Sequence, residues 1–176
     1  RQHISAASLP GLRERTVTIG GYSKTFSITG WRIGYVAAPA EILAKAAICS
    51  DLLYVCAPHP LQRGVLKGLD SPPEYYEHMR AEYQKVRDLT CDALEAAKFA
   101  VYRPQGSYYV MADFSALGWP DDQTASMELL KRAKIAAIPG GAFYEPASGR
   151  GRKLLRFCFA KELPVIEEAC RRLRAL

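Results

Sequence analysis

The chain of 176 residues is 49% hydrophobic and 24% charged, and its formal net charge at pH 7 is +6. This composition indicates a soluble globular protein with one or two hydrophobic cores, and no apolar run approaches the ~20 residues of a membrane span. The basic residues are dispersed along the chain, so we expect neither a nucleic-acid partner nor a membrane partner.

The cysteine and histidine residues indicate neither disulfide bonds nor a metal site. The histidines are far apart in the sequence. The five cysteines form no C-x-x-C pair and stand in apolar contexts: Cys49, Cys56, Cys91, Cys158 and Cys170. We therefore expect reduced cysteines in the core of a cytoplasmic protein without bound metal.

The first predicted elements are two strands on either side of a polar loop. Residues 16–19 form an apolar, β-branched run, and residues 33–37 form a second run before Pro39. The loop between them contains Lys24 and, eight positions later, Arg32. A strand-to-loop junction is where a rigid scaffold usually presents chemistry. The residues alone also fit a surface loop with two solvated cations.

Helices are predicted next, at 40–57 and at about 61–69, because apolar residues recur at helical spacing and Pro58 and Pro60 interrupt the pattern. The segment Ser71-Pro72-Pro73 is the best candidate for a domain boundary. A long helix begins near Pro73, a residue suited to a first helical turn. Its apolar face runs to Ala97, and we interpret the tyrosines on that face as core residues.

The remaining predicted elements alternate strands and helices. Strands are expected near 99–102, at 108–113 and at 136–138, and helices at about 123–134 and from Glu162 to Leu176. Residues 139–151 form a glycine-rich loop. Its glycines could bind a phosphate, although neither a lysine nor a helix start follows at the spacing of a Walker motif.

Residues 154–160 predict a strand with one unusual position. Leu155, Phe157 and Phe159 share one face of the strand, and Arg156 lies on the other. An arginine in so apolar a strand is costly unless it is paired. The strand pattern leaves two readings open: an ion pair with a buried carboxylate, or a binding site for an anion.

Several of these segments together resemble the class I/II aminotransferases, which are fold-type I enzymes dependent on pyridoxal 5'-phosphate (PLP). Residues 21–34 resemble the family's PLP attachment segment, and the run from Leu155 to Lys161 resembles the strand that binds the substrate α-carboxylate. Residues 104–109 and 138–140 also match. The resemblance is closest to the kynurenine, methionine and glutamine-type aminotransferases, some of which are also cysteine-conjugate β-lyases.

The resemblance implies a role for each candidate site residue. Lys24 would form the Schiff base with PLP, and Arg32 would bind the cofactor's phosphate, with Ser23 adding a hydroxyl donor. These types suit the chemistry, because lysine can supply a neutral amine and arginine supplies a planar fork of donors. Arg156 would bind the substrate α-carboxylate. Tyr108 fits the substrate pocket and a core position equally well.

The resemblance also implies an α/β fold. Residues 1–70 would be the C-terminal part of the large PLP-binding domain, with a mostly parallel sheet, and residues 73–176 the small C-terminal domain. The carboxylate that pairs with the PLP ring nitrogen has no counterpart here, because Glu14 is the only acid before Lys24 and does not fit that motif. We therefore expect a C-terminal fragment that is inactive in isolation.

The implied activity is amino-group transfer between an amino acid and a 2-oxo acid by a full-length homodimer. One alternative is a PLP-dependent β-lyase that uses the same residues to eliminate a group from Cβ. A second alternative is a non-catalytic chain that acts only through its interfaces.

Overall fold

The computed structural model describes residues 3–176, which divide into two units, one ending at Pro73 and one from Glu74 to Leu176. The α/β class is confirmed, with five α-helices and six strands in the described residues. The assignment of the first unit to a large PLP-binding domain and of the second to a small C-terminal domain remains a prediction.

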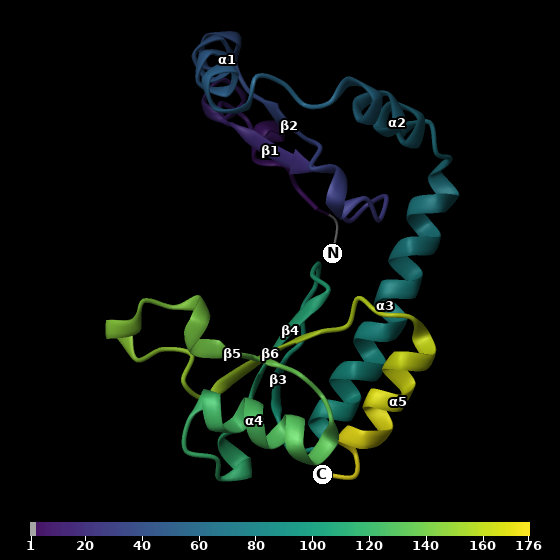
Figure 1. Ribbon diagram of the computed structural model, residues 1–176, viewed down its shortest axis with the longest axis vertical. Helices are drawn as coiled ribbons and strands as arrows, with labels where there is room; N and C mark the ends of the chain where they lie inside the picture. Colours follow the sequence, from purple (N-terminus) through teal and green to yellow (C-terminus); the bar gives the residue numbers. More distant parts are fainter. Residues whose placement is uncertain (1–2) are drawn as a thin grey trace. The chain divides into compact units, whose positions relative to one another are not determined.

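The first unit contains one strand pair and two helices (Figure 1). Strands β1 (Thr18–Gly21) and β2 (Gly34–Ala37) pair antiparallel. They follow each other in the chain and enclose a loop without a crossover helix, so this pair does not represent the mostly parallel sheet that the resemblance implies. Helices α1 (Ala40–Tyr54) and α2 (His59–Leu69) follow.

The two helices of this unit differ in their bounds from the prediction. Helix α1 ends at Tyr54, and Val55 has a positive φ of 66°, with ψ of −71°, which stops the helix. Helix α2 begins before Pro60 rather than after it. A proline is accepted in the first helical turn because its missing N–H has no partner there.

Few side chains of this unit are buried. Among its described residues, Ile33 and Val65 are the buried hydrophobic side chains. Helix α1 buries none, and its Leu52 and Leu53 are 81% and 80% exposed. This unit therefore has little hydrophobic core of its own.

The second unit is built on a four-stranded antiparallel sheet (Figure 1). The strands lie in the order β3 (Ala100–Tyr102), β4 (Tyr109–Asp113), β6 (Leu154–Cys158) and β5 (Ile138–Pro139). In the central pair, Met111 lies opposite Arg156 and Tyr109 lies opposite Cys158. Arg156, one of the candidate site residues, therefore lies on one of the two central strands of the sheet.

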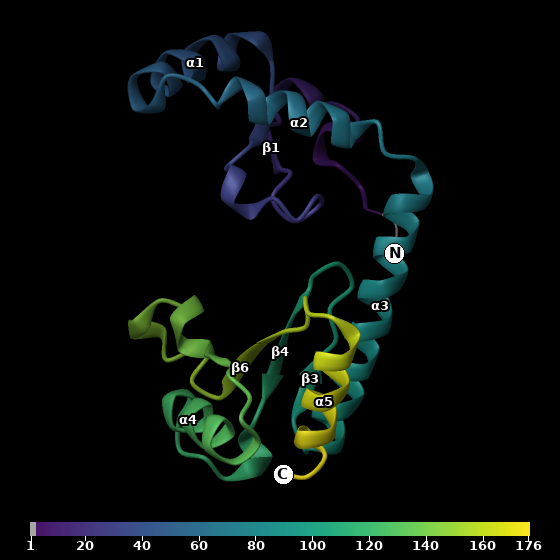
Figure 2. The same cartoon turned by 45° about the vertical axis from the view of Figure 1, so that its right-hand side comes forward.

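Three helices contribute to the core on one face of this sheet. They are α3 (Pro73–Ala96), α4 (Asp122–Ala133) and α5 (Leu163–Leu173). Helices α3 and α5 lie side by side in both views (Figures 1 and 2). All three bury side chains in the same cluster as the inward residues of β4 and β6, which include Val110 and Leu155.

The predicted alternation of the 154–160 strand is confirmed. Leu155, Phe157 and Phe159 are 0%, 4% and 0% exposed and belong to the core. Arg156 is half-buried, on the opposite face. The helices therefore cover one face of the sheet, and Arg156 faces away from that core.

The expectation that all five cysteines lie in the core is wrong for three of them. Cys91 and Cys170 are buried, and burial raises the pKa of both thiols. Cys49, Cys56 and Cys158 are exposed. Cys49 lies in α1, which buries no residue, Cys56 follows that helix, and Cys158 has the outward register of β6.

Candidate functional site

The predicted PLP-binding residues lie in the loop between β1 and β2. The loop is closed at its base by the Tyr22 N–H, which donates to the Ile33 carbonyl at 3.2 Å. Lys24 follows in a run of turns and is exposed. Its Nζ donates a long hydrogen bond of 3.5 Å to the Thr29 hydroxyl, which in turn donates to the Ser23 carbonyl at 3.4 Å.

Arg32 contacts the same threonine. Its guanidinium donates to the Thr29 carbonyl at 3.2 Å, and its backbone is left-handed, with φ of 56°. A bulky residue in this conformation carries strain of about 1–3 kcal/mol, and such strain concentrates at binding sites. Thr29 therefore joins Ser23, Lys24 and Arg32 into one polar cluster, a contact that the sequence analysis did not identify.

Arg156 lies between two aromatic rings in the second unit. Its guanidinium carbon is 4.1 Å from the ring centroid of Tyr109 and 4.3 Å from that of Phe143. The Nε atom is buried and has no hydrogen-bond partner. No salt bridge among the described residues includes Arg156, so the ion-pair reading of this position has no support in residues 3–176.

Tyr109 and Phe143 were both missed at the sequence level. The strand that contains Tyr109 was predicted, but the observed register is needed to put Tyr109 diagonally from Arg156 on the same face of the sheet. Phe143 ends a 3-10 turn, Gly140–Phe143, that follows β5. No periodic pattern extends into that turn, so local sequence gave no signal for its contact with Arg156.

Tyr108 lies beside this arrangement and is half-buried against the core. Its ring centroid is 4.5 Å from that of Tyr109 and 6.2 Å from that of Tyr83. Burial, together with a hydrogen bond to Tyr109, raises the pKa of the Tyr108 hydroxyl. Tyr108 thus supports Tyr109 from the core side, and its predicted place in a substrate pocket remains a prediction.

The first glycines of the loop after β5, Gly140 and Gly141, do not make their backbone amides available to a phosphate. The Gly141 N–H donates to the carboxylate of Asp122 at 2.7 Å. Gly140 is packed against backbone, because a side chain there would meet Gly151 O at 2.5 Å and Leu154 O at 2.6 Å. A carboxylate at this position disfavours a bound phosphate through like-charge repulsion.

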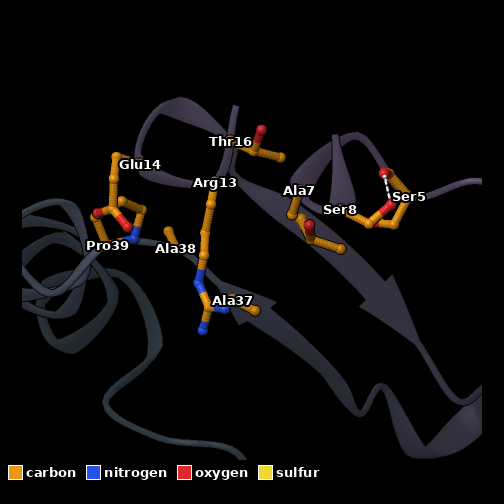
Figure 3. Close-up of a pocket in the computed structure, with 10 residues that line it drawn as sticks. Ser5, Ala7, Ser8, Arg13, Glu14, Thr16, Ala37, Ala38 and Pro39 are labelled. Atoms are coloured by element: carbon orange, nitrogen blue, oxygen red, sulfur yellow. Dashed lines mark hydrogen bonds between the residues drawn. The ribbon is translucent and has the colours of Figure 1, made fainter. Parts of the chain in front are cut away.

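A separate cavity of about 560 Å³ lies in the first unit (Figure 3). It is lined by residues before and at the start of β1 and by residues at and after the end of β2, including Arg13, Glu14 and Ala37. Figure 3 shows the Arg13 side chain extending toward Ala37. None of the five predicted site residues lines this cavity.

The structure therefore brings the predicted site residues together in two groups. Ser23, Lys24 and Arg32 meet around Thr29 in the first unit, and Tyr108 and Arg156 both contact Tyr109 in the second. The first group offers an amine and a guanidinium, and the second offers a guanidinium with an unpaired buried donor. These are the groups that bind an aldehyde, a phosphate and a carboxylate.

The known proteins to which this chain is similar in sequence and structure include several aminotransferases. The chain aligns with methionine aminotransferase of Escherichia coli at 33% identity, over 99% of this chain and 45% of that enzyme. It aligns with aspartate aminotransferase of Musicola paradisiaca at 36% identity, over 95% of this chain and 41% of that enzyme. The solved structure of N-succinyldiaminopimelate aminotransferase from Mycobacterium tuberculosis superimposes with a TM-score of 0.91 at 33% identity, over 99% of this chain and 45% of that one.

Residues 3–173 match the sequence profile of the family described as aminotransferase class I and II. The chain belongs to this family. It spans 41–45% of the length of the relatives named above. The predicted family and fold are thus confirmed, whereas the roles of the individual site residues remain predictions.

Proposed function

We propose that the full-length protein is a PLP-dependent aminotransferase that moves an amino group between an amino acid and a 2-oxo acid. The observation that carries this proposal is the Arg156 guanidinium, held between two rings with a buried Nε that has no partner. A buried donor without a partner costs free energy unless a ligand satisfies it. The α-carboxylate shared by amino acids and 2-oxo acids suits this need, because it accepts bidentate hydrogen bonds from a guanidinium.

The cluster around Thr29 fits PLP by the chemistry of its donors. In this proposal Lys24 holds the cofactor covalently through Nζ, Arg32 binds its phosphate, and Ser23 adds a hydroxyl donor. When bound, PLP supplies an electron-withdrawing ring that makes the proton on the substrate Cα easier to remove. The positive charge of the Arg32 guanidinium also favours a dianionic phosphate.

The chain's own residues then act on the amino acid in distinct ways. Lys24 Nζ would be freed when the substrate's amino group takes its place on the cofactor, and the free amine would then take the proton from the substrate Cα and later return a proton, as a general base and then an acid. Arg156 fixes the α-carboxylate and so decides which bond of Cα is aligned for reaction. Tyr108 lines the substrate pocket.

We further propose that the enzyme is a cytoplasmic homodimer. Exposed apolar side chains of α1, such as Leu52 and Leu53, offer surface for association with a second copy of the chain. Among residues 3–176, no helix combines the length and apolarity needed to cross a membrane. Light scattering during size exclusion of the full-length protein tests the oligomeric state.

Reductive labelling tests the assignment of Lys24. The full-length protein is incubated with PLP, reduced with borohydride and digested, and we expect a single labelled peptide that contains Lys24. Lys24→Ala should abolish the label, and Lys45→Ala, which removes an exposed lysine of α1, should retain it. A label on another lysine in the wild-type protein contradicts the assignment.

A second assay distinguishes amino transfer from elimination. Without an acceptor 2-oxo acid, an aminotransferase releases at most one equivalent of the donor's 2-oxo acid per active site, because continued turnover needs an acceptor for the amino group. A β-lyase releases 2-oxo acid without an acceptor, by breaking the bond at Cβ. We expect product formation to depend on the acceptor.

A further inference from the structure

The turn that carries Phe143 is held by a buried carboxylate from a different element. Asp122 is the first residue of α4 and is 6% exposed. Its Oδ2 accepts a hydrogen bond of 2.7 Å from the Gly141 N–H, across 19 residues of sequence. A negative charge at this position is also stabilised by the positive end of the helix dipole.

The space beside Gly141 is matched to this carboxylate. A side chain at position 141 would place its Cβ 2.9 Å from Asp122 Oδ2, so the carboxylate occupies the volume that a side chain would need. Gly140 is equally confined by the backbone of Gly151 and Leu154. The backbone at the start of the turn is therefore closely packed on both sides while Gly141 contacts Asp122.

Phe143 depends on this turn for its position. Its side chain is 45% exposed, so burial in the core does not hold it. It nevertheless lies over Arg156, with 4.3 Å between the guanidinium carbon and the ring centroid. Because Phe143 is two residues beyond Gly141 in a short 3-10 turn, a shift of the Gly141 amide moves the ring.

We propose that Asp122 is a positioning residue for the carboxylate-binding site: it holds the Gly140–Phe143 turn so that Phe143 covers one face of the Arg156 guanidinium while Tyr109 covers the other. The two rings fix the plane of the guanidinium and exclude water from its faces, which leaves its edge for a carboxylate. The identity of the ligand rests on the proposed function, whereas the placement of Phe143 does not.

The test follows the Nε–H resonance of Arg156 in full-length protein labelled with 15N-arginine, identified by its loss in Arg156→Lys. A ring above and a ring below the guanidinium shift this resonance upfield, and Phe143→Leu gives the position expected when one ring is lost. Asp122→Leu removes the acceptor of the Gly141 N–H, and the Arg156 Nε–H resonance of this variant should have the same chemical shift as in Phe143→Leu. Asp122→Asn retains an acceptor oxygen and should stay near the wild-type position.

A matched control separates positioning from general stability. Ser126 lies on the same helix and donates to the Ala137 carbonyl at 2.7 Å, before the turn begins. Ser126→Ala should leave the Arg156 resonance in place, even where it lowers the melting temperature. If Asp122→Leu does not fold, Gly141→Ala provides the same test, because its Cβ displaces the turn from Asp122.

Kinetics give the functional readout. Asp122→Leu should raise KM for the amino acid about tenfold, the size of one cation–π contact in a desolvated site, with kcat little changed. An unmoved resonance in folded Asp122→Leu or Gly141→Ala overturns the proposal. A resonance that moves in a protein that binds no carboxylate supports the positioning role of Asp122 and instead contradicts the proposed function.

Discussion

The guanidinium carbon of Arg156 lies 4.1 Å from the ring centroid of Tyr109, on the face of the sheet that points away from the core. The contact is diagonal across β4 and β6, because Met111 is the direct partner of Arg156 and Tyr109 pairs with Cys158. Aromatic and long side chains reach such diagonal neighbours in antiparallel sheets. The register of two strands thus decides which ring supports the arginine.

Tyr109 should matter through its ring and not through its hydroxyl. Tyr109→Leu removes the cation–π contact and should weaken binding of a carboxylate substrate by about 0.5–2 kcal/mol. Tyr109→Phe keeps the ring and should retain most of the wild-type affinity. Affinity for the amino acid, measured with each variant of the full-length protein, checks this. Equal losses in both variants would point to the hydroxyl instead.

Removal of Arg156 should affect substrates and not the attachment of PLP. We expect Arg156→Ala to lower kcat/KM for α-amino acids by an amount corresponding to about 2–4 kcal/mol, because a bidentate, charge-assisted contact is lost. Arg156→Lys should be intermediate, since an ammonium lacks the planar fork. Borohydride labelling of Lys24 should persist in both variants. An unchanged kcat/KM in Arg156→Ala would assign Arg156 a structural role.

The acid stability of α5 should depend on Glu168. Its carboxylate accepts from Arg171 and Arg172 at 2.6 and 2.7 Å, and these contacts lower the pKa of Glu168 to about 2 from an ordinary 4.5. A carboxyl whose folded pKa is lowered stabilises the fold above its ordinary pKa, and this contribution is lost as the pH falls toward the folded pKa. The contribution of Glu168 should therefore disappear between pH 4.5 and about 2.

Urea unfolding at several pH values checks this. Wild-type protein should lose more stability than Glu168→Gln across that pH window, and the two should converge at its acidic end. Glu167→Gln is the matched control, because Glu167 precedes Glu168 on the same helix and is absent from the salt bridges of the described residues. Parallel curves for wild type and Glu168→Gln would show that the ion pair does not contribute.

The two units should differ in their ability to fold alone. A chain of residues 74–176 contains the buried cluster of α3, α4, α5 and the sheet and should show a cooperative thermal transition. A chain of residues 1–73 should show none and should associate, because Ile33 and Val65 are its buried hydrophobic side chains among the described residues, while Leu52 and Leu53 are exposed. Calorimetry and size exclusion of the two chains test this. A cooperative, monomeric 1–73 chain would contradict it.

Local sequence indicated most of the helices and strands and the five candidate site residues of this protein. The alternation at 154–160 correctly predicted which side chains of β6 enter the core, because side chains of a strand point to opposite faces in turn. The segment around Lys24 and Arg32 identified the family that the comparisons confirm. Both signals lie within short stretches of chain, where spacing along the backbone is enough.

Only the tertiary structure decided what surrounds those residues. The rings on either side of Arg156 come from β4 and from the turn after β5, and the carboxylate that holds this turn comes from α4. The exposure of Cys49 and Cys158 likewise follows from the helix and strand faces on which they lie. These contacts depend on strand register and helix packing, which join residues far apart in sequence, and no local pattern encodes them.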